Sequence, residues 1–200
     1  MNYSELLKQY GPNDPRAVKW DNRNTQYFRF KILCEIADLT EASVLDFGCG
    51  LGDLYDYLKF NGFRGDYKGF DPNKELIVAA SKRHSPKLFS SNQLTTADYI
   101  LSSGVFNEKD SPDIKEKILE LYPLANKGLA VNAISTASKE PLGGINYTDP
   151  AKLLDWCLRN ITKFVTLRHD YRGGNFTIYL YKHKGVDFLS TLGFFTGITI

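Results

Sequence analysis

The stretch SVLDFGCGLGDLYDYL, residues 43–58, places three glycines at alternate positions between two periodic segments. The aliphatic run before the glycines is typical of a buried strand, and the spacing of apolar residues after them is typical of a helix. Glycine lets the backbone turn sharply and lets a ligand approach without a side chain in the way. A strand, a glycine loop and a helix in this order predict a ligand site at the carboxyl edge of a parallel sheet.

The rest of the chain alternates strand and helix patterns around this unit, which predicts an α/β fold with a doubly wound, mostly parallel, seven-stranded sheet. The last two strands flank the turn RGGN and predict a C-terminal antiparallel hairpin. Ser111 is the expected cap of the helix that follows it. The expected helices cover residues 26–39, 52–62, 73–84, 111–125 and 148–161. The expected strands cover residues 43–47, 66–72, 86–90, 97–106, 128–136, 163–171 and 176–182.

Two cofactor chemistries use a glycine loop of this kind. A dinucleotide site has the spacing G-x-G-x-x-G, whereas Gly48, Gly50 and Gly52 have the spacing G-x-G-x-G. Asp53 stands where the third dinucleotide glycine would fall, and its charge would lie near a pyrophosphate. The spacing therefore argues against a nicotinamide or flavin cofactor. An ordinary strand-to-helix turn that binds no ligand is a further alternative.

The sequence LDFGCGLG resembles the D-x-G-x-G-x-G motif of class I S-adenosylmethionine-dependent methyltransferases. The resemblance covers residues 28–182 and implies a Rossmann-like methyltransferase fold with S-adenosylmethionine (SAM) as cofactor. In that family, an acidic residue ending the first strand serves the ammonium group of SAM. A second acidic residue, ending the second strand, accepts the ribose hydroxyls. Asp46 and Asp71 match these two positions, although Asp71 precedes proline and could also cap a helix.

The same resemblance implies further cofactor contacts in the loops and near the first helix. The family often has an acidic or amide residue after the third strand to meet the adenine amine, and Asn92 is the candidate here. The segment before the first helix often folds over the cofactor in this fold. The expected cofactor-binding residues are Gln26, Arg29, Asp46, Phe47, Gly48, Cys49, Gly50, Gly52, Asp71, Pro72, Asn92, Ser103 and Gly104.

The acceptor side is predicted from the ends of the later strands. His169 is the most suitable general base by residue type, and Tyr171 is a weaker candidate. Both depend on the sixth strand running parallel to the others, and the alternative is a hairpin with solvated polar residues. Residues 135–150 form a long polar, glycine-rich segment, which predicts a specificity loop. The expected acceptor-binding residues are Trp20, Asn107, Tyr147 and Arg172, and no metal is expected.

The sequence limits the class of methyl acceptor only by excluding some candidates. The N-P-P-Y tetrapeptide of amino-group DNA methyltransferases is missing, and SSGVFN stands in its place. The net charge of +2 gives no sign of a basic surface for nucleic acid. We therefore expect a small molecule with a nitrogen or oxygen nucleophile. A protein or RNA methyltransferase and a non-catalytic SAM-binding module are the alternatives, and the sequence does not indicate the oligomeric state.

Length and composition fit one globular domain with two short flanking segments. Residues 1–25 are expected to be an N-terminal segment that acts as a lid, residues 26–182 the methyltransferase domain, and residues 183–200 an apolar tail. The three cysteines lack metal-ligand spacing, which is typical of free thiols in a reducing compartment. No apolar run reaches membrane-spanning length, so we expect a cytoplasmic protein without a membrane partner.

Overall fold

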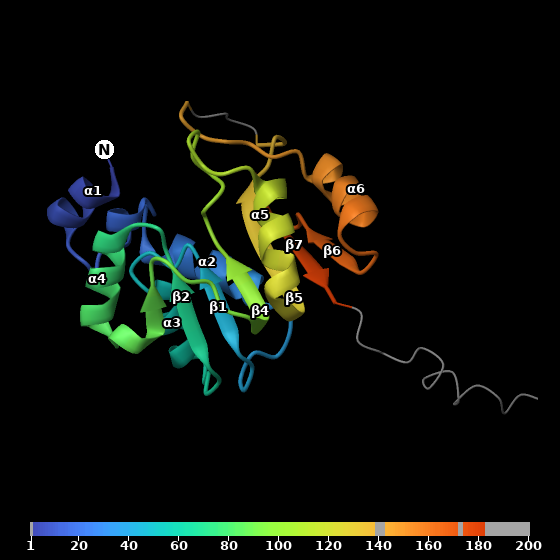
Figure 1. The fold of residues 1–200 in the computed structure, drawn as a ribbon. Coiled ribbons are helices and arrows are strands. Elements are labelled where there is room, and N and C mark those ends of the chain that lie inside the picture. Colours follow the sequence, from blue (N-terminus) through green and yellow to red (C-terminus); the bar gives the residue numbers. More distant parts are fainter. Residues whose placement is uncertain (1, 139–142, 172–173, 183–200) are drawn as a thin grey trace, which may run out of the picture.

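A seven-stranded sheet forms the centre of the protein, in the order β3-β2-β1-β4-β5-β7-β6 (Figure 1). This computed structural model describes residues 2–138, 143–171 and 174–182. Strands β1 to β5 pair in parallel, whereas β7 pairs antiparallel with both β5 and β6. The predicted α/β sheet with its C-terminal hairpin is therefore confirmed. The strands are β1 (Val44–Phe47), β2 (Tyr67–Phe70), β3 (Phe89–Ser90), β4 (Ala97–Ser102), β5 (Ala125–Ile134), β6 (Val165–Arg168) and β7 (Asn175–Tyr181).

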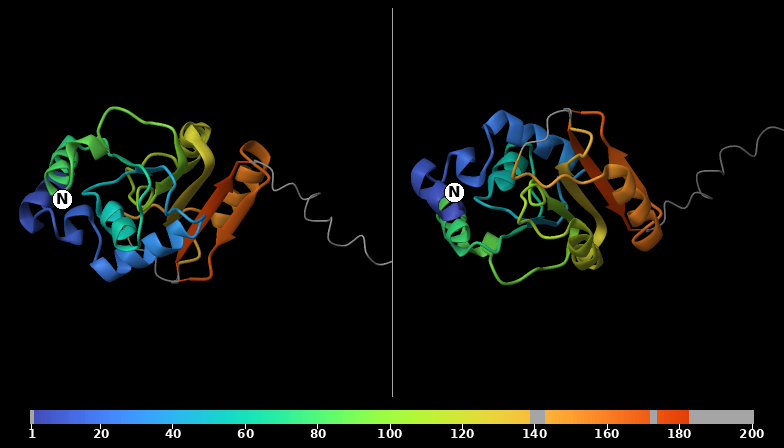
Figure 2. Two further views of the ribbon diagram at one scale, coloured as in Figure 1. Left: turned by 90° about the horizontal axis from the view of Figure 1, so that it is seen from below. Right: turned by 90° about the horizontal axis from the view of Figure 1, so that it is seen from above.

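Helices cover both faces of the sheet. Figure 2 shows α2 and α3 on one face and α5 and α6 on the other. The α-helices are α1 (Tyr3–Tyr10), α2 (Arg23–Cys34), α3 (Asp53–Phe60), α4 (Lys74–Arg83), α5 (Ile114–Leu121) and α6 (Pro150–Asn160). Three short 3-10 helices are η1 (Pro15–Val18), η2 (Pro86–Leu88) and η3 (Tyr122–Leu124). Among the described residues, no helix is long and apolar enough to cross a membrane.

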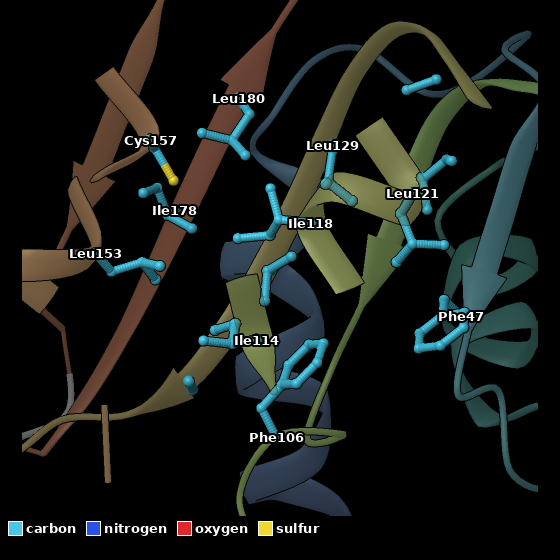
Figure 3. Close-up of a cluster of buried hydrophobic side chains, with 14 of the residues drawn as sticks. Phe47, Phe106, Ile114, Ile118, Leu121, Leu129, Leu153, Cys157, Ile178 and Leu180 are labelled. Carbon is cyan, nitrogen blue, oxygen red and sulfur yellow. The ribbon is translucent and has the colours of Figure 1, made fainter. Parts of the chain in front are cut away.

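Each face of the sheet has its own hydrophobic core. Figure 3 shows the core under α5 and α6, where apolar residues recur at helical spacing on each helix and meet the alternate residues of β5 and β7. Truncating one such fully buried aliphatic side chain to alanine typically costs about 2–5 kcal/mol. The labelled residues of this core are Phe47, Phe106, Ile114, Ile118, Leu121, Leu129, Leu153, Cys157, Ile178 and Leu180.

The N-terminal elements differ from the expectation. Helix α2 begins at Arg23 rather than at residue 26, because the Asn22 side chain caps it by accepting the Thr25 N–H. It ends at Cys34, five residues before the predicted end. Helix α1 was not predicted, and it starts with a capping box in which Asn2 and Glu5 bond each other's backbone. No residue of α1 is fully buried, although its Tyr3, Leu7 and Tyr10 pack against a small buried cluster.

The cap of α5 also differs from the expectation. Asp113, rather than Ser111, accepts the N–H groups of the first turn, from Lys115 and Glu116. The Ser111 hydroxyl instead accepts the Glu108 N–H in the loop after β4. Ser111 therefore shapes that loop and does not start the helix.

Strand directions place several loops at one edge of the sheet. Strands β1, β2, β4 and β5 run parallel, so the loops that follow them gather at their carboxyl ends. Strand β6 also runs in this direction, because it and β5 are both antiparallel to β7. However, β7 lies between β5 and β6. Strand β6 is therefore an edge strand, and its end lies away from the loops that follow β1, β2, β4 and β5.

Candidate active site

A cavity of about 1100 Å³ lies at the carboxyl edge of the parallel strands. Its lining comes from the loops after β1, β2, β4 and β5, from the start of β7, and from the N-terminal segment. Ligand sites usually measure about 300–1,000 Å³. This cavity is therefore large enough for a cofactor together with a second small molecule.

The glycine loop after β1 forms the floor of this cavity. Gly48 and Gly50 have φ values of +79° and +53°, a region that L side chains rarely adopt. A Cβ at Gly48 would lie 2.1 Å from Val105 Cγ2, and one at Gly50 would lie 3.2 Å from Val18 Cγ1. Glycine is thus required at both positions, and the bare backbone forms part of the lining. Gly52 lies outside the described lining and serves as the N-terminal cap residue of α3.

Asp46, near the end of β1, is a buried carboxyl that faces the cavity. It is only 3% exposed and accepts a hydrogen bond of 2.7 Å from the Tyr67 hydroxyl. Burial raises the pKa of Asp46 to about 7, and the charges of Asp71 and Asp53 add to this rise. The Tyr67 hydroxyl acts in the opposite direction by stabilising the charged form. A cationic ligand group beside Asp46 would favour its ionised form in the same way.

Asp71 follows β2 and connects two loops of the site. Its Oδ2 accepts the Gly50 N–H at 3.0 Å, and its Oδ1 accepts the Asn73 N–H at 2.9 Å. Burial raises the pKa of Asp71. Asn73, rather than Asp71, caps α4, because its side chain accepts the N–H groups of Glu75 and Leu76. The carboxylate of Asp71 is therefore not used as the helix cap.

Strand β5 holds the loop after β4 in place. The side chain of Asn132 accepts the Gly104 N–H at 3.0 Å and donates to the Ser103 hydroxyl at 2.9 Å. Farther along the loop, Asn107 Oδ1 accepts the Ile134 N–H at 3.1 Å. The sequence analysis named Ser103, Gly104 and Asn107 as binding residues, and all three line the cavity.

The segment before α2 and the start of that helix close another side of the cavity. The Arg29 guanidinium lies 5.0 Å from the centroid of the Trp20 ring, and both residues line the cavity. A Cβ at Gly104 would lie 3.1 Å from Trp20 Cζ2, so this ring covers the loop after β4. Gln26 also reaches the lining, but its amide donates to Asp53 at 2.9 Å.

Asp53 is the centre of a buried ionic network beneath the glycine loop. Its carboxylate pairs with Arg23 at 2.8 Å and with Arg83 at 2.9 Å. Because the two guanidinium groups compensate its charge, Asp53 can remain buried at 3% exposure. The sequence analysis used Asp53 only as an argument against dinucleotide binding. The structure shows that its ion pairs also connect the glycine loop to α2 and α4.

Several predicted residues lie elsewhere. His169 is exposed after β6, and the Tyr171 hydroxyl bonds the Thr177 hydroxyl at 2.7 Å. Asn92 is exposed and accepts a hydrogen bond from the Ser90 hydroxyl. None of these three belongs to the described lining, whereas Phe47, Cys49, Pro72 and Tyr147 do. Arg172 and the predicted tail, residues 183–200, fall outside the described residues.

The sequence analysis named neither Glu108 nor Asn175, which are among the polar residues of the lining. Glu108 accepts the Tyr3 hydroxyl at 2.9 Å and pairs with the Lys19 ammonium group. Asn175 begins β7 and lies opposite Ile134 at the end of β5. Glu108 lies in the loop after β4, whose last residue is Ser102, and Asn175 is the first residue of β7. A rule that marks the polar residues at strand ends would have found Asn175 but not Glu108.

Several solved methyltransferases share this architecture. Magnesium protoporphyrin IX methyltransferase of Synechocystis PCC 6803, solved with bound SAM, matches with a TM-score of 0.58 and 14% identity, over 92% of this chain and 98% of that chain. The plantazolicin methyltransferase BpumL, in complex with S-adenosylhomocysteine (SAH), matches with a TM-score of 0.63 and 16% identity, over 91% and 95%. The architecture is that of the class I SAM-dependent methyltransferases. The two proteins act on different acceptors, so the fold leaves the acceptor open.

Sequence comparison gives the family. The family model described as a methyltransferase domain matches residues 20–161. The Mycobacterium tuberculosis (strain H37Rv) protein Rv1506c, which carries methyltransferase in its name, is 34% identical over 154 residues, or 70% of this chain and 93% of that protein. The chain therefore belongs to the methyltransferase-domain family, and it is an enzyme whose cofactor is SAM.

Proposed function

We propose that this methyltransferase transfers the methyl group of SAM to a nitrogen or oxygen atom of a small molecule. The observation that carries the proposal is the single cavity, which joins the glycine loop to the loops after β4 and β5. Its volume of about 1100 Å³ has room for both reactants. Placing both in one cavity aligns the nucleophile with the methyl carbon, which supplies much of the rate in such a reaction.

The charge of the lining supports a small molecule over RNA. The described lining holds three basic side chains, those of Lys19, Arg29 and Lys117. It holds seven acidic ones, those of Asp21, Asp46, Asp53, Asp71, Glu108, Asp110 and Glu120. Proteins that bind nucleic acid neutralise phosphates with basic side chains. Arg23 and Arg83 compensate the charge of Asp53, which leaves six acidic against three basic side chains. This acidic excess favours a neutral or cationic acceptor beside the cationic sulfonium.

The residues of the first two strand ends fit SAM. In this proposal Asp46 faces the ammonium group, and the bare backbone at Gly48 and Gly50 lets the ligand approach. Asp71 accepts the ribose hydroxyls, because a carboxylate offers about four lone-pair sites and only two are used by backbone N–H groups. Arg29 supplies a positive charge for the carboxylate of SAM. The remaining proposed cofactor contacts in the lining are Gln26, Phe47, Cys49, Pro72, Ser103 and Gly104.

Bound SAM would supply a methyl carbon on a positive sulfur. Transfer would break the sulfur–carbon bond with its electron pair going to sulfur, bond the acceptor atom to the carbon, and release the acceptor's proton to solvent. The protein positions the acceptor and excludes water around it. Trp20, Asn107 and Tyr147 are the proposed acceptor contacts, since all three line the cavity. His169, the base expected from the sequence, lies outside that lining, so we assign it no proton transfer.

We also propose that residues 2–25 act as a lid over the cofactor. Val18 lies over Gly50 and Trp20 over Gly104, so the segment covers two loops of the site. The cluster that joins this segment to the domain has Ala17, Leu51 and Leu76 as its buried residues, and Ala17 alone of these belongs to residues 2–25. Few buried contacts mean a low free energy of local opening. The hydrogen bond and ion pair to Glu108 then hold the lid against the loop after β4.

Methyl-labelled SAM tests the proposed acceptor class. The protein is incubated with labelled SAM and three fractions of a cell extract: small molecules, RNA and protein. We expect label in the small-molecule fraction alone. Label in RNA or protein would contradict the proposal, and SAH binding without any labelled product would favour the non-catalytic SAM-binding module.

A further inference from the structure

Asn175 lies in the wall of the cavity at the junction of β5 and β7. It is the first residue of β7 and pairs with Ile134, the last residue of β5. Both residues line the cavity. The Ile134 N–H is held by Asn107, which the sequence already marked as an acceptor contact. Asn175 therefore belongs to the acceptor half of the site rather than to the glycine loop.

The side-chain oxygen of Asn175 differs from the other buried polar groups on this face of the sheet. The residue is 7% exposed, and Oδ1 is buried without a hydrogen-bond partner in the described part of the chain. Two residues farther along β7, the Thr177 hydroxyl bonds Tyr171. On β5, both ends of the Asn132 amide are bonded to the loop after β4. The Ser102 hydroxyl at the end of β4 is also buried without a described partner, but Ser102 does not line the cavity, whereas Asn175 does.

A buried carbonyl oxygen without a donor is unfavourable, and a ligand that supplies the donor removes this cost. We propose that Asn175 recognises the methyl acceptor by accepting a hydrogen bond from its N–H or O–H group. An amide oxygen is not a base, so Asn175 selects and orients the acceptor and does not deprotonate it. This inference rests on the proposed function and assigns to Asn175 the recognition of the hydrogen-bond donor on the acceptor.

The same contact distinguishes acceptor from product. Methylation of a hydroxyl gives an ether, and methylation of a secondary N–H gives a tertiary nitrogen; neither product retains the donor. If the donor is the group that is methylated, the hydrogen bond to Asn175 is lost on transfer and the product binds more weakly. The cavity also offers the aromatic rings of Trp20 and Tyr147, so planar aromatic molecules are suitable probes.

Matched fragments test the proposal before the acceptor is known. The probes are indole against 1-methylindole and phenol against anisole, titrated by ligand-observed NMR into protein saturated with SAH. We expect each donor fragment to bind about five- to tenfold more tightly than its methylated partner. Leucine is similar in shape to asparagine but has no hydrogen-bond-accepting oxygen, so the two fragments of each pair should bind Asn175→Leu with about equal affinity. The matched control is Asn160→Leu at the exposed end of α6, which leaves the preference unchanged.

Equal binding of the paired fragments to the wild type would overturn the proposal, and so would no detectable binding by any of the four fragments. An unchanged preference for the donor fragments in Asn175→Leu would also overturn it. Calorimetry with SAH is run on every variant to verify folding. If Asn175→Leu does not bind SAH, the wild-type comparison decides alone. Failure of the wild type to bind SAH overturns the proposed function, whereas SAH binding with equal fragment affinities overturns only the role of Asn175.

Discussion

The Tyr67 hydroxyl donates a hydrogen bond of 2.7 Å to the Asp46 carboxyl, and both side chains are at most 3% exposed. Burial raises the pKa of Asp46 from its ordinary value of 3.8 to about 7. The charged form that would bind the ammonium group of the ligand therefore costs folding free energy near neutral pH. This pair connects the stability of the protein to its affinity for the cofactor.

The affinity for SAH should rise with pH because of Asp46. Between pH 6 and pH 8 the carboxyl passes from mostly protonated to mostly ionised, and only the ionised form attracts the ammonium group. We expect calorimetric titrations to give about a several-fold stronger affinity at pH 8 than at pH 6. Asp46→Asn should bind SAH more weakly and without this dependence. An equal pH dependence in the variant would assign the effect to another group, such as Asp71.

The stability of the ligand-free protein should show the opposite trend. A raised pKa in the folded state gives stability that is fully present below the unfolded pKa, near 3.8, and is lost as pH rises through the folded pKa, near 7. The stability of Asp46→Asn relative to the wild type should therefore increase from about pH 4 to about pH 7 and then level off. Thermal melts across this range measure it, and a pH-independent difference would contradict the assignment.

Glu108 should control the exchange of the cofactor. Replacing Glu108 with Gln removes the ion pair to Lys19, so the lid opens more easily and SAH dissociates several-fold faster. Stopped-flow fluorescence of Trp20 in a Trp156→Phe background reports the rate, because Trp20 lines the cavity and Trp156 belongs to α6. Glu116→Gln, on the exposed part of α5, is the matched control. An unchanged dissociation rate in Glu108→Gln would rule out this role of Glu108.

His169 should be dispensable for transfer. It is exposed after β6, and two strands separate β6 from β4. Once the labelling experiment has provided an acceptor, His169→Ala should keep kcat and KM within about twofold of the wild type across pH 6 to 9. Loss of kcat together with a changed pH dependence of the rate would restore His169 as the general base.

The sequence could predict that the ends of β1 and β2 lie close together, because the carboxyl ends of neighbouring parallel strands meet at one edge of the sheet. This is why Asp46 and Asp71 were expected together, and the structure brings both into the lining of one cavity. The order of the later strands could not be predicted, since it depends on long-range packing. The sequence left the direction of β6 open. The strand runs parallel to β5, yet β7 lies between the two and separates His169 from the cavity.

Features that depend on contacts between distant segments were also missed. Helix α1 has no fully buried residue, and it is held by contacts with distant segments, such as that of Tyr3 with Glu108. Likewise, nothing local distinguishes Asn175 from any polar residue that starts a strand. Only the packing around it shows that its oxygen is buried beside the cavity.

Calorimetric titration of SAH into the wild type and Asp71→Ala tests the central claim most directly. The claim is that the carboxylate connecting the loops after β1 and β2 also accepts the ribose of the cofactor. We predict micromolar binding to the wild type, about −8 kcal/mol, and no measurable binding to Asp71→Ala, whereas Asp155→Ala on exposed α6 binds like the wild type. Equal affinities of Asp71→Ala and the wild type, or no binding by the wild type, would contradict the account.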